Sequence, residues 1–338
     1  MHRIGVVGFG GMGTRHSNCY QANPEAELAA VVDIRRERRQ AAEEKFSIPT
    51  YEALEMMLEH EELEVIDVCL PTYLHKDATV TALEAGYHVI CEKPMALTVE
   101  ECRAMVEAGR RSGRFLMVAH VIRFWPEYEV LKGLVESEEL GRLCHISCER
   151  LASPPLWSWE NWMMDPKRSG GGALDLHIHD TDFVLHVLGK PKAVTSLGRC
   201  TESGWGHIST LYHYDGATAL AEGGWDFEVQ GFPFHMAYKA VFERGAVEFN
   251  IMTSPTITIF EDGKEPRHPE LPPPVVATDD AGINIADLGG YYRETAYFLD
   301  CIEAGGKPKR SMPEESMEAV GVCLAEMESA ATGNTIEV

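Results

Sequence analysis

The chain has 338 residues, of which 45% are hydrophobic and 25% charged, and its formal net charge is −23. This length favours two domains, and the negative charge opposes binding to nucleic acid or to an anionic membrane. The apolar runs are too short to span a membrane, and the first strand, expected at about Arg3, leaves no room for a signal peptide. The nine cysteines include no C-x-x-C pair. Together these observations predict a cytoplasmic protein.

Short apolar runs alternate with helical patterns in the first third of the chain. We expect strands at 4–8, 28–32, 65–70, 87–91 and 115–119, and helices near 12–22, 35–46, 73–85 and 98–112. Thr98 and Glu101 have the spacing of a capping box, and Gly113 follows the end of that helix. Alternation of strand and helix predicts an α/β domain, over residues 1–121, with a doubly wound parallel sheet.

The pattern changes after a helix expected near 126–136. Strand-like runs with short connections lie at 143–151, 192–200, 207–214, 217–228, 234–243, 246–251 and 256–261, and helices are expected near 172–188, 290–303 and 313–331. Asp215-Gly216 and Asp262-Gly263 are typical of hairpin turns. Residues 122–338 are therefore predicted to form an α+β domain with a large, mainly antiparallel sheet. A sheet covered by helices on one face has a second face to bury, which predicts a homodimer or homotetramer.

A glycine-rich loop follows the first expected strand. Gly8 permits a tight turn, Gly10 permits close approach of a pyrophosphate, and Gly13 permits packing of the next helix against the sheet. Asp33 ends the second strand, about 20 residues beyond Gly13, where a carboxylate accepts hydrogen bonds from a ribose. The loop therefore predicts a dinucleotide-binding Rossmann domain, with the pyrophosphate at a helix N-terminus.

Asp33 favours NAD, because the 2′-phosphate of NADP would meet a like charge at this position. Arg35 and Arg36 leave NADP open, since either side chain can reach a 2′-phosphate. We expect NAD.

Glu92, Lys93 and Pro94 follow the fifth expected strand. Ligands of doubly wound sheets bind at the carboxyl ends of the strands, so Lys93 is expected near the nicotinamide. An ammonium group at that position hydrogen-bonds a reacting oxygen and stabilises its alkoxide character. Pro94 fixes the backbone that follows, through a trans or a cis bond.

Four segments together resemble one known family: C-L-P-T-Y-L-H at 69–75, A-G-Y-H-V-I-C-E-K-P at 85–94, G-G-G-A-L-D-L-H-I-H-D-T-D at 170–182 and F-L-D-C-I-E-A-G-G-K-P at 298–308. They are similar to the glucose–fructose oxidoreductase/inositol dehydrogenase (Gfo/Idh/MocA) family. The resemblance implies an NAD(P)-dependent oxidoreductase acting on a sugar, a polyol or a related hydroxy compound. It also implies that the cofactor contacts Gly8, Gly10, Gly11, Met12, Gly13, Asp33, Arg35, Pro71, His75, Glu92 and Lys93.

The resemblance assigns the proton acceptor to His179 and a substrate-facing carboxylate to Asp175. The two residues are four apart, so on a helix they share one face. A histidine suits acid/base work because its ordinary pKa is near 6.5. His177 departs from the family pattern and either reaches the substrate or points away from His179, while Asp182 is expected to anchor the helix.

The histidines and carboxylates between Asp175 and Asp182 also raise the possibility of a metal site. Only some of them can converge from one helix, and no distant Cys/His pair completes a set, so we expect no metal. Further substrate contacts are predicted at Arg123, Trp157, Trp162, His177 and Tyr292, because arginine binds carboxylates and aromatic rings stack on sugars.

The sequence therefore predicts an NAD(P)-dependent dehydrogenase or reductase of a sugar, inositol or related polyol, with Lys93, Asp175 and His179 in catalysis. Two alternatives remain open at this point. One is an NAD-dependent glycosidase that uses transient oxidation and elimination. The other is a non-catalytic NAD-binding sensor, which would need the glycine loop but not these three residues.

Overall fold

The chain forms two compact units. The computed structural model describes residues 1–226, 232–273 and 289–338. One unit comprises Met1–Phe124 and Pro273–Met317, and the other comprises Trp125–Pro272 and Glu318–Val338. The chain first passes from one unit to the other between Phe124 and Trp125, close to the expected boundary between 121 and 122. The return of the chain to the first unit differs from the expected arrangement, in which everything beyond 122 belongs to one domain.

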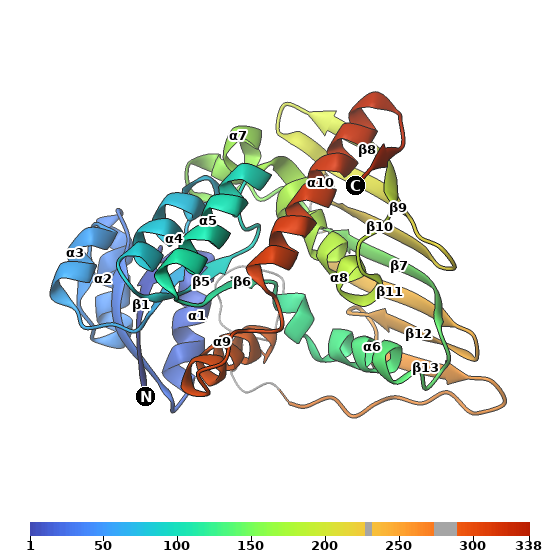
Figure 1. The fold of residues 1–338 in the computed structure, drawn as a ribbon, viewed down its shortest axis with the longest axis horizontal. Helices are drawn as coiled ribbons and strands as arrows, with labels where there is room; N and C mark the ends of the chain where they lie inside the picture. The colour runs from blue at the N-terminus through green and yellow to red at the C-terminus, as the bar shows by residue number, and fades with distance from the viewer. Residues whose placement is uncertain (227–231, 274–288) are drawn as a thin grey trace. The chain divides into compact units, whose positions relative to one another are not determined.

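The first unit is built on a parallel sheet of six strands in the order β3-β2-β1-β4-β5-β6 (Figure 1). Its strands are β1 His2–Val7, β2 Ala26–Val32, β3 Thr50–Tyr51, β4 Val65–Val68, β5 His88–Glu92 and β6 Leu116–Ala119. Its helices are α1 Gly11–Ala22, α2 Arg36–Phe46, α3 Leu54–His60, α4 His75–Glu84, α5 Val99–Ser112 and α9 Gly289–Glu303. This confirms the doubly wound fold and all five expected strands. The short β3 and α3 were not predicted.

The start and end of α5 follow the expected capping pattern. The Thr98 hydroxyl accepts a hydrogen bond from the Glu101 backbone N–H at 3.2 Å. Gly113 ends the helix with a φ of 69°, a left-handed conformation that glycine adopts without steric cost.

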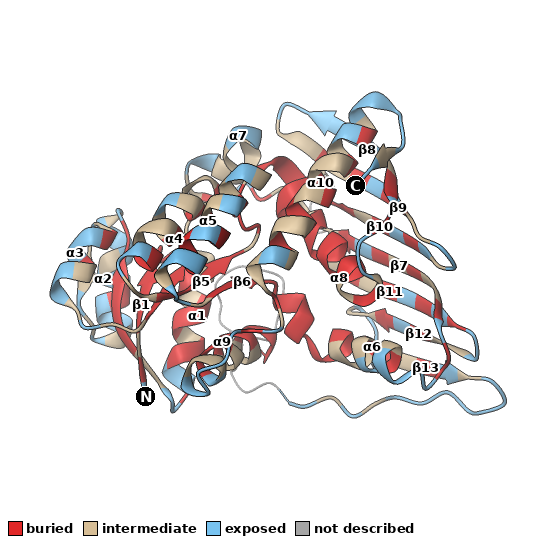
Figure 2. Ribbon diagram, in the orientation of Figure 1, coloured by how far each residue is buried: buried red, intermediate tan, exposed pale blue. Residues whose placement is uncertain are grey.

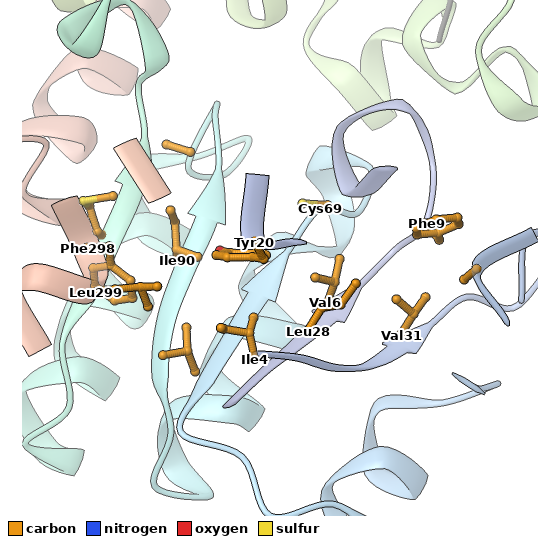
Figure 3. Close-up of a cluster of buried hydrophobic side chains, with 14 of the residues drawn as sticks. Ile4, Val6, Phe9, Tyr20, Leu28, Val31, Cys69, Ile90, Phe298 and Leu299 are labelled. Carbon is orange, nitrogen blue, oxygen red and sulfur yellow. The ribbon is translucent and has the colours of Figure 1, made fainter. Parts of the chain in front are cut away.

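The core of the first unit explains why α9 belongs to it. Ile4, Val6 and Ile90, from the central strands, are wholly buried. Phe298 and Leu299 of α9 pack into the same cluster (Figure 3). The sheet therefore buries apolar side chains against a helix that follows it by more than half the chain.

The second unit is built on a sheet of eight strands in the order β13-β12-β11-β7-β10-β9-β8-β14 (Figure 1). The strands are β7 Leu143–Leu151, β8 Ala193–Thr201, β9 Gly204–His213, β10 Thr218–Gly224, β11 His235–Phe242, β12 Gly245–Asn250, β13 Ile257–Glu261 and β14 Ile336–Glu337. Its helices are α6 Pro126–Ser137, α7 Pro166–Ser169, α8 Ile178–Leu188 and most of α10 Pro313–Thr332. All described neighbours pair antiparallel except β7 and β10, which are parallel. Residues 227 and 228 of the run expected at 217–228 lie outside the described residues.

Helices cover one face of the eight-stranded sheet (Figure 1). Tyr128 of α6 packs edge-on against Phe183 of α8 with ring centroids 4.6 Å apart, and both rings contact Tyr238 of β11. Along the strands, buried and accessible residues alternate (Figure 2). Large apolar side chains remain accessible at Leu197, Leu211, Leu220, Val241 and Phe260. Among the described helices, none is long and apolar enough to cross a membrane.

Candidate functional site

The glycine loop connects β1 to α1. Gly8 has a φ of 95°, and a Cβ at Gly8 would lie 2.6 Å from the carbonyl oxygen of Cys69. A Cβ at Gly13 would lie 1.8 Å from the carbonyl oxygen of Gly8, so only glycine permits α1 to pack this closely. At Gly10 the nearest atom to such a Cβ, among the described residues, is an Arg35 nitrogen at 4.0 Å. The loop is therefore closely packed at Gly8 and Gly13 and leaves space beside Gly10.

The first turn of α1 suits a pyrophosphate. Its N-cap is Gly10, and among the described residues no side chain caps this end of the helix. The backbone N–H groups of a first helical turn have no partner within the helix and carry partial positive charge. Gly11, Met12 and Gly13 lie in this turn, and their contact with the cofactor stays a prediction. An NAD pyrophosphate fits this arrangement.

Asp33 joins the glycine loop to the end of β2. Its Oδ2 accepts a hydrogen bond from the Phe9 N–H at 2.9 Å, and its Oδ1 accepts one from the Arg35 N–H at 2.9 Å. The Arg35 guanidinium lies 3.1 Å from each carboxylate oxygen. The two residues expected to select between NAD and NADP are therefore hydrogen-bonded to each other.

Replacing Asp33 with alanine is expected to weaken NADH binding about 10–100-fold, because hydrogen bonds to a charged group contribute about 1.5–3 kcal/mol each. NADPH binding should weaken less, since the carboxylate repels a 2′-phosphate. Titration of NADH and NADPH fluorescence measures both dissociation constants. Asp33→Asn is the matched control, because it keeps an acceptor for Phe9. Equal weakening of both cofactors in Asp33→Ala would contradict a selecting role.

Lys93 directly follows the last residue of β5. The Glu92 carboxylate accepts a hydrogen bond from the Lys93 backbone N–H at 3.0 Å, and the peptide bond between Lys93 and Pro94 is cis. Glu92 is buried, whereas Lys93 is partly exposed. The structure therefore fixes the backbone of Lys93 and leaves its side chain at the edge of the sheet where ligands bind.

His75 begins α4 and lies in the interior of the first unit. Its Nδ1 is 2.9 Å from the carbonyl oxygen of Pro94, and its Nε2 is 2.7 Å from that of Leu70. His75 thus connects the segments that follow β4 and β5. Its ring nitrogens thereby support the backbone beside Lys93, and the direct cofactor contact expected of His75 stays a prediction. Pro71 lies next to this contact and is partly exposed.

Asp175 lies in a π-helical turn, Ala173–His177, that runs directly into α8. Such turns occur frequently at functional sites, because the wider winding changes which side chains share a face. Asp175 and His179 retain 6% and 9% exposure, whereas His177, Asp180 and Asp182 retain none. Asp175 in the turn and His179 in α8 are therefore slightly less buried than His177, Asp180 and Asp182.

His177 faces the interior of the second unit. Its Nε2 lies 2.9 Å from a Glu326 carboxylate oxygen of α10, and both side chains are wholly buried. The ring lies over Gly223 of β10, where a Cβ would be 2.7 Å from its Nδ1. Of the two orientations left open by the sequence, the structure has the one in which His177 points to the core.

Comparison with known proteins identifies both units. The profile of the oxidoreductase family with an NAD-binding Rossmann fold matches residues 2–120, and the Gfo/Idh/MocA C-terminal domain profile matches residues 128–248. The chain belongs to the Gfo/Idh/MocA family. Its first unit is an NAD-binding Rossmann domain.

The sequence identity between this chain and individual relatives is low. Mouse trans-1,2-dihydrobenzene-1,2-diol dehydrogenase is 27% identical over 97% of this chain and 96% of its own length. D-glucoside 3-dehydrogenase of Escherichia coli is 31% identical, but the match spans 56% of this chain and 54% of that protein. The structure of levoglucosan dehydrogenase with NADH and levoglucosan covers 100% of this chain and 99% of its own, with a TM-score of 0.86 at 22% identity. This last likeness shows the fold.

The further substrate contacts predicted from the sequence differ in their exposure to solvent. Arg123 is wholly buried and forms an ion pair with Glu315, both within the Rossmann unit, so its charge already has a carboxylate partner. Trp157 is 63% exposed, and Trp162 and Tyr292 are partly exposed. The aromatic candidates are therefore accessible, and the arginine is not.

A buried polar cluster in the Rossmann unit was missed by sequence reasoning. His16, Asp67 and Cys69 have ligand-type atoms within 4.8 Å of one another, and Glu92 and Glu294 also approach His16. The cysteine thiol and the imidazole both contact the aspartate, so these groups are partners of one another. The available signal was Asp67, a carboxylate within a short apolar strand, because buried charges are found paired.

Removing the Asp180 charge is expected to destabilise the second unit strongly. Arg150 of β7 makes hydrogen bonds of 2.9 and 3.0 Å to the two Asp180 oxygens, and both side chains are buried. Breaking one half of such a pair costs about 3–5 kcal/mol, so calorimetry of Asp180→Asn should show a Tm about 6–20 °C lower. Glu243→Gln, which breaks an exposed pair with Arg142, is the control and should change Tm far less. Equal shifts would contradict a structural role for Asp180.

Proposed function

We propose that this protein is an NAD-dependent dehydrogenase or reductase that acts on a CH–OH group of a sugar, an inositol or a related polyol. The observation that carries the proposal is the presence of Lys93, whose backbone the Glu92 carboxylate fixes, together with the slightly exposed Asp175 and His179, in a chain with an NAD-binding domain. A protein that only sensed NAD would need the glycine loop and Asp33 alone.

Each residue has a separate task in this reaction. When bound, NAD supplies the acceptor for the hydride that leaves the substrate carbon. Lys93 donates a hydrogen bond to the substrate oxygen as negative charge develops on it. His179 accepts the hydroxyl proton, and Asp175 orients the imidazole or binds a neighbouring hydroxyl.

The names of relatives support this substrate class. They include D-glucoside 3-dehydrogenase and, from Thermotoga maritima, a myo-inositol 2-dehydrogenase that is 30% identical over 56% of this chain. Preference for NAD over NADP rests on Asp33 and on the Arg35 fork that already holds it. One relative is named a D-xylose 1-dehydrogenase (NADP(+)), so Arg35 is the residue through which NADP would be accepted.

A second function, elimination or addition on a sugar through transient oxidation by tightly held NAD, is favoured by a different observation. A relative from Escherichia coli that is 30% identical over 59% of this chain is named 2,7-anhydro-N-acetylneuraminate hydratase. Water addition or elimination on a sugar involves no net oxidation, so tightly held NAD would be regenerated in each cycle. The same residues serve both reactions, because transient oxidation also needs Lys93 and His179.

The test is the absorbance of NADH while protein and NAD are mixed with inositols, aldoses, sugar acids and nitrophenyl glycosides. Growth of the signal with one class of hydroxy compound is expected and identifies the substrate class. Release of nitrophenol without accumulation of NADH would favour the second function. Silence with every compound, in protein that binds NADH, would contradict both.

We also propose that the accessible face of the eight-stranded sheet binds a second copy of the chain. Leu211 and Leu220 are directly paired across β9 and β10 and are 37% and 42% exposed, and Leu197 is 73% exposed. Sedimentation should give a mass of twice 37.6 kDa or a higher multiple. Leu220→Glu should shift the mass to that of the single chain. A wild-type monomer would contradict this assembly.

A further inference from the structure

His16 lies at the centre of the buried polar cluster of the Rossmann unit. It is wholly buried in α1, and its two ring nitrogens face different strands. Its Nδ1 is 2.8 Å from Asp67 Oδ2 on β4, and its Nε2 is 3.2 Å from Glu92 Oε1 on β5. One imidazole therefore lies between two carboxylates from neighbouring strands.

The second oxygen of Glu92 links this cluster to Lys93. Oε2 accepts the hydrogen bond from the Lys93 backbone N–H at 3.0 Å. A short path therefore runs from Asp67 through the His16 ring to Glu92 and on to the backbone of Lys93. Every group in this path except Lys93 is buried, so water does not compete strongly for these contacts.

The groups around His16 favour its charged form. Burial lowers the pKa of His16, but Asp67 at hydrogen-bond distance and Cys69 together outweigh this effect and raise the pKa well above 6.5. Asp67 itself is held by the Tyr20 hydroxyl at 2.8 Å and the Cys69 thiol at 3.3 Å. The titratable groups facing His16 come from α1, β4 with the segment after it, β5 and α9: Arg15, Cys19, Tyr20, Asp67, Cys69, Glu92, Tyr291 and Glu294.

The buried tyrosines and cysteines among these neighbours are neutral near pH 7. Burial raises the pKa of Tyr20 and of Cys69 well above their ordinary values, and raises that of Cys19 to about 12. Burial also raises the pKa of Glu294, whose Oε1 is 3.8 Å from His16. A charged imidazole between Asp67 and Glu92 is therefore the arrangement that balances the cluster.

We propose that His16 is a positioning residue for Lys93: paired with Asp67, it holds the Glu92 carboxylate and thereby the Lys93 backbone. The consequence for turnover rests on the proposed function, in which the Lys93 ammonium contacts the reacting oxygen. A displacement of that ammonium by a fraction of an ångström weakens a hydrogen bond that matters most as charge develops. His16 itself touches neither substrate nor nicotinamide in this assignment.

The first test measures the backbone directly and needs no substrate. Hydrogen exchange with mass spectrometry is followed in the peptide that contains Lys93. In His16→Gln the Lys93 amide is expected to exchange at least about ten-fold faster, because Glu92 loses its partner. His88→Gln is the matched control, since His88 is a buried histidine at the opposite end of β5. Equal acceleration in both variants, throughout the unit, would overturn the proposal.

The pH dependence adds a readout that a purely packing role would not change. A raised folded pKa means that the imidazolium contribution is complete below pH 6.5 and is lost as the pH rises through the folded pKa. Protection of the Lys93 amide in the wild type should therefore decline with rising pH beyond the ordinary exchange trend. In His16→Gln this extra decline should disappear. Its persistence would overturn the assignment to His16.

The turnover arm separates this proposal from the proposed function. His16→Gln is expected to lower kcat about 10–100-fold while KM and the NADH dissociation constant stay within about five-fold. The double variant His16→Gln/Asp67→Asn should keep a kcat at least about five times the value predicted by multiplying the effects of the two single substitutions. The reason is that Asp67→Asn removes a carboxylate that has lost its charged partner. Faster exchange at Lys93 with unchanged kcat would overturn the link to catalysis. Stoichiometric metal in the wild type that is lost in His16→Gln would replace positioning with a metal site.

Discussion

Replacing Lys93 with alanine is expected to lower kcat by about 10²–10⁴-fold while leaving NADH affinity within a few-fold. Lys93 directly follows β5 and Glu92 fixes its backbone, whereas the residues that we expect to hold the cofactor are the glycine loop and Asp33, which the Phe9 N–H joins. Steady-state kinetics with the substrate found in the panel, together with NADH titration, measures both quantities.

The control for the Lys93 variant is another lysine of the same unit. Lys76, on α4, forms an ion pair with Asp77 and is partly exposed, so Lys76→Ala should leave kcat nearly unchanged. Lys93→Met keeps the length of the side chain without its charge and should resemble Lys93→Ala. Unchanged turnover in either Lys93 variant would remove this residue from catalysis and return weight to the sensor hypothesis.

Replacing His179 with alanine is expected to lower kcat/KM for oxidation by about 10²–10⁴-fold and to abolish its rise with pH. The rise follows deprotonation of the base, because only neutral imidazole accepts the hydroxyl proton. For an ordinary imidazole it occurs around pH 6.5. A profile of kcat/KM from pH 5 to 9, at saturating NAD, measures it, with the pH limits set about two units either side of neutrality.

His177 provides the comparison for His179. Since its ring is paired with Glu326 in the interior, His177→Gln should lower Tm while the rise of kcat/KM with pH remains. Persistence of the rise in His179→Ala, together with its loss in His177→Gln, would show that the acid/base role belongs to His177.

Much of the fold was predictable because its local signals agree with one another. The apolar runs at 4–8 and 87–91 correspond to β1 and β5, and the Thr98 cap begins α5 as expected. The brief β3 was missed because two residues carry no periodicity. The parallel pairing of β7 with β10 was also missed, since it joins strands that are far apart in the chain.

The candidate site was predictable in its residue types and less so in its contacts. The i, i+4 reasoning for Asp175 and His179 assumed an ordinary α-helix, whereas a π-turn precedes α8. The His75 ring is held by backbone carbonyl groups and the Arg123 guanidinium by a carboxylate, and these partners come from other segments of the chain. His16 lies three residues beyond Gly13, yet its importance depends on strands that follow much later. Tertiary partners, rather than local spacing, decide which polar residues are buried.

The assignment of Pro273–Met317 to the first unit has a consequence for biosynthesis. The side chains of Phe298 and Leu299 complete a core whose strands are all made before residue 120. A ribosome that has synthesised the whole parallel sheet has therefore not yet supplied the helix that covers this part of it. The other unit is interrupted in the same way, because Glu318–Val338 is made after the segment that returns to the first unit. The first unit therefore cannot reach its complete core until residues 289–303 have been made, and the second unit cannot do so until residues 318–338 have been made.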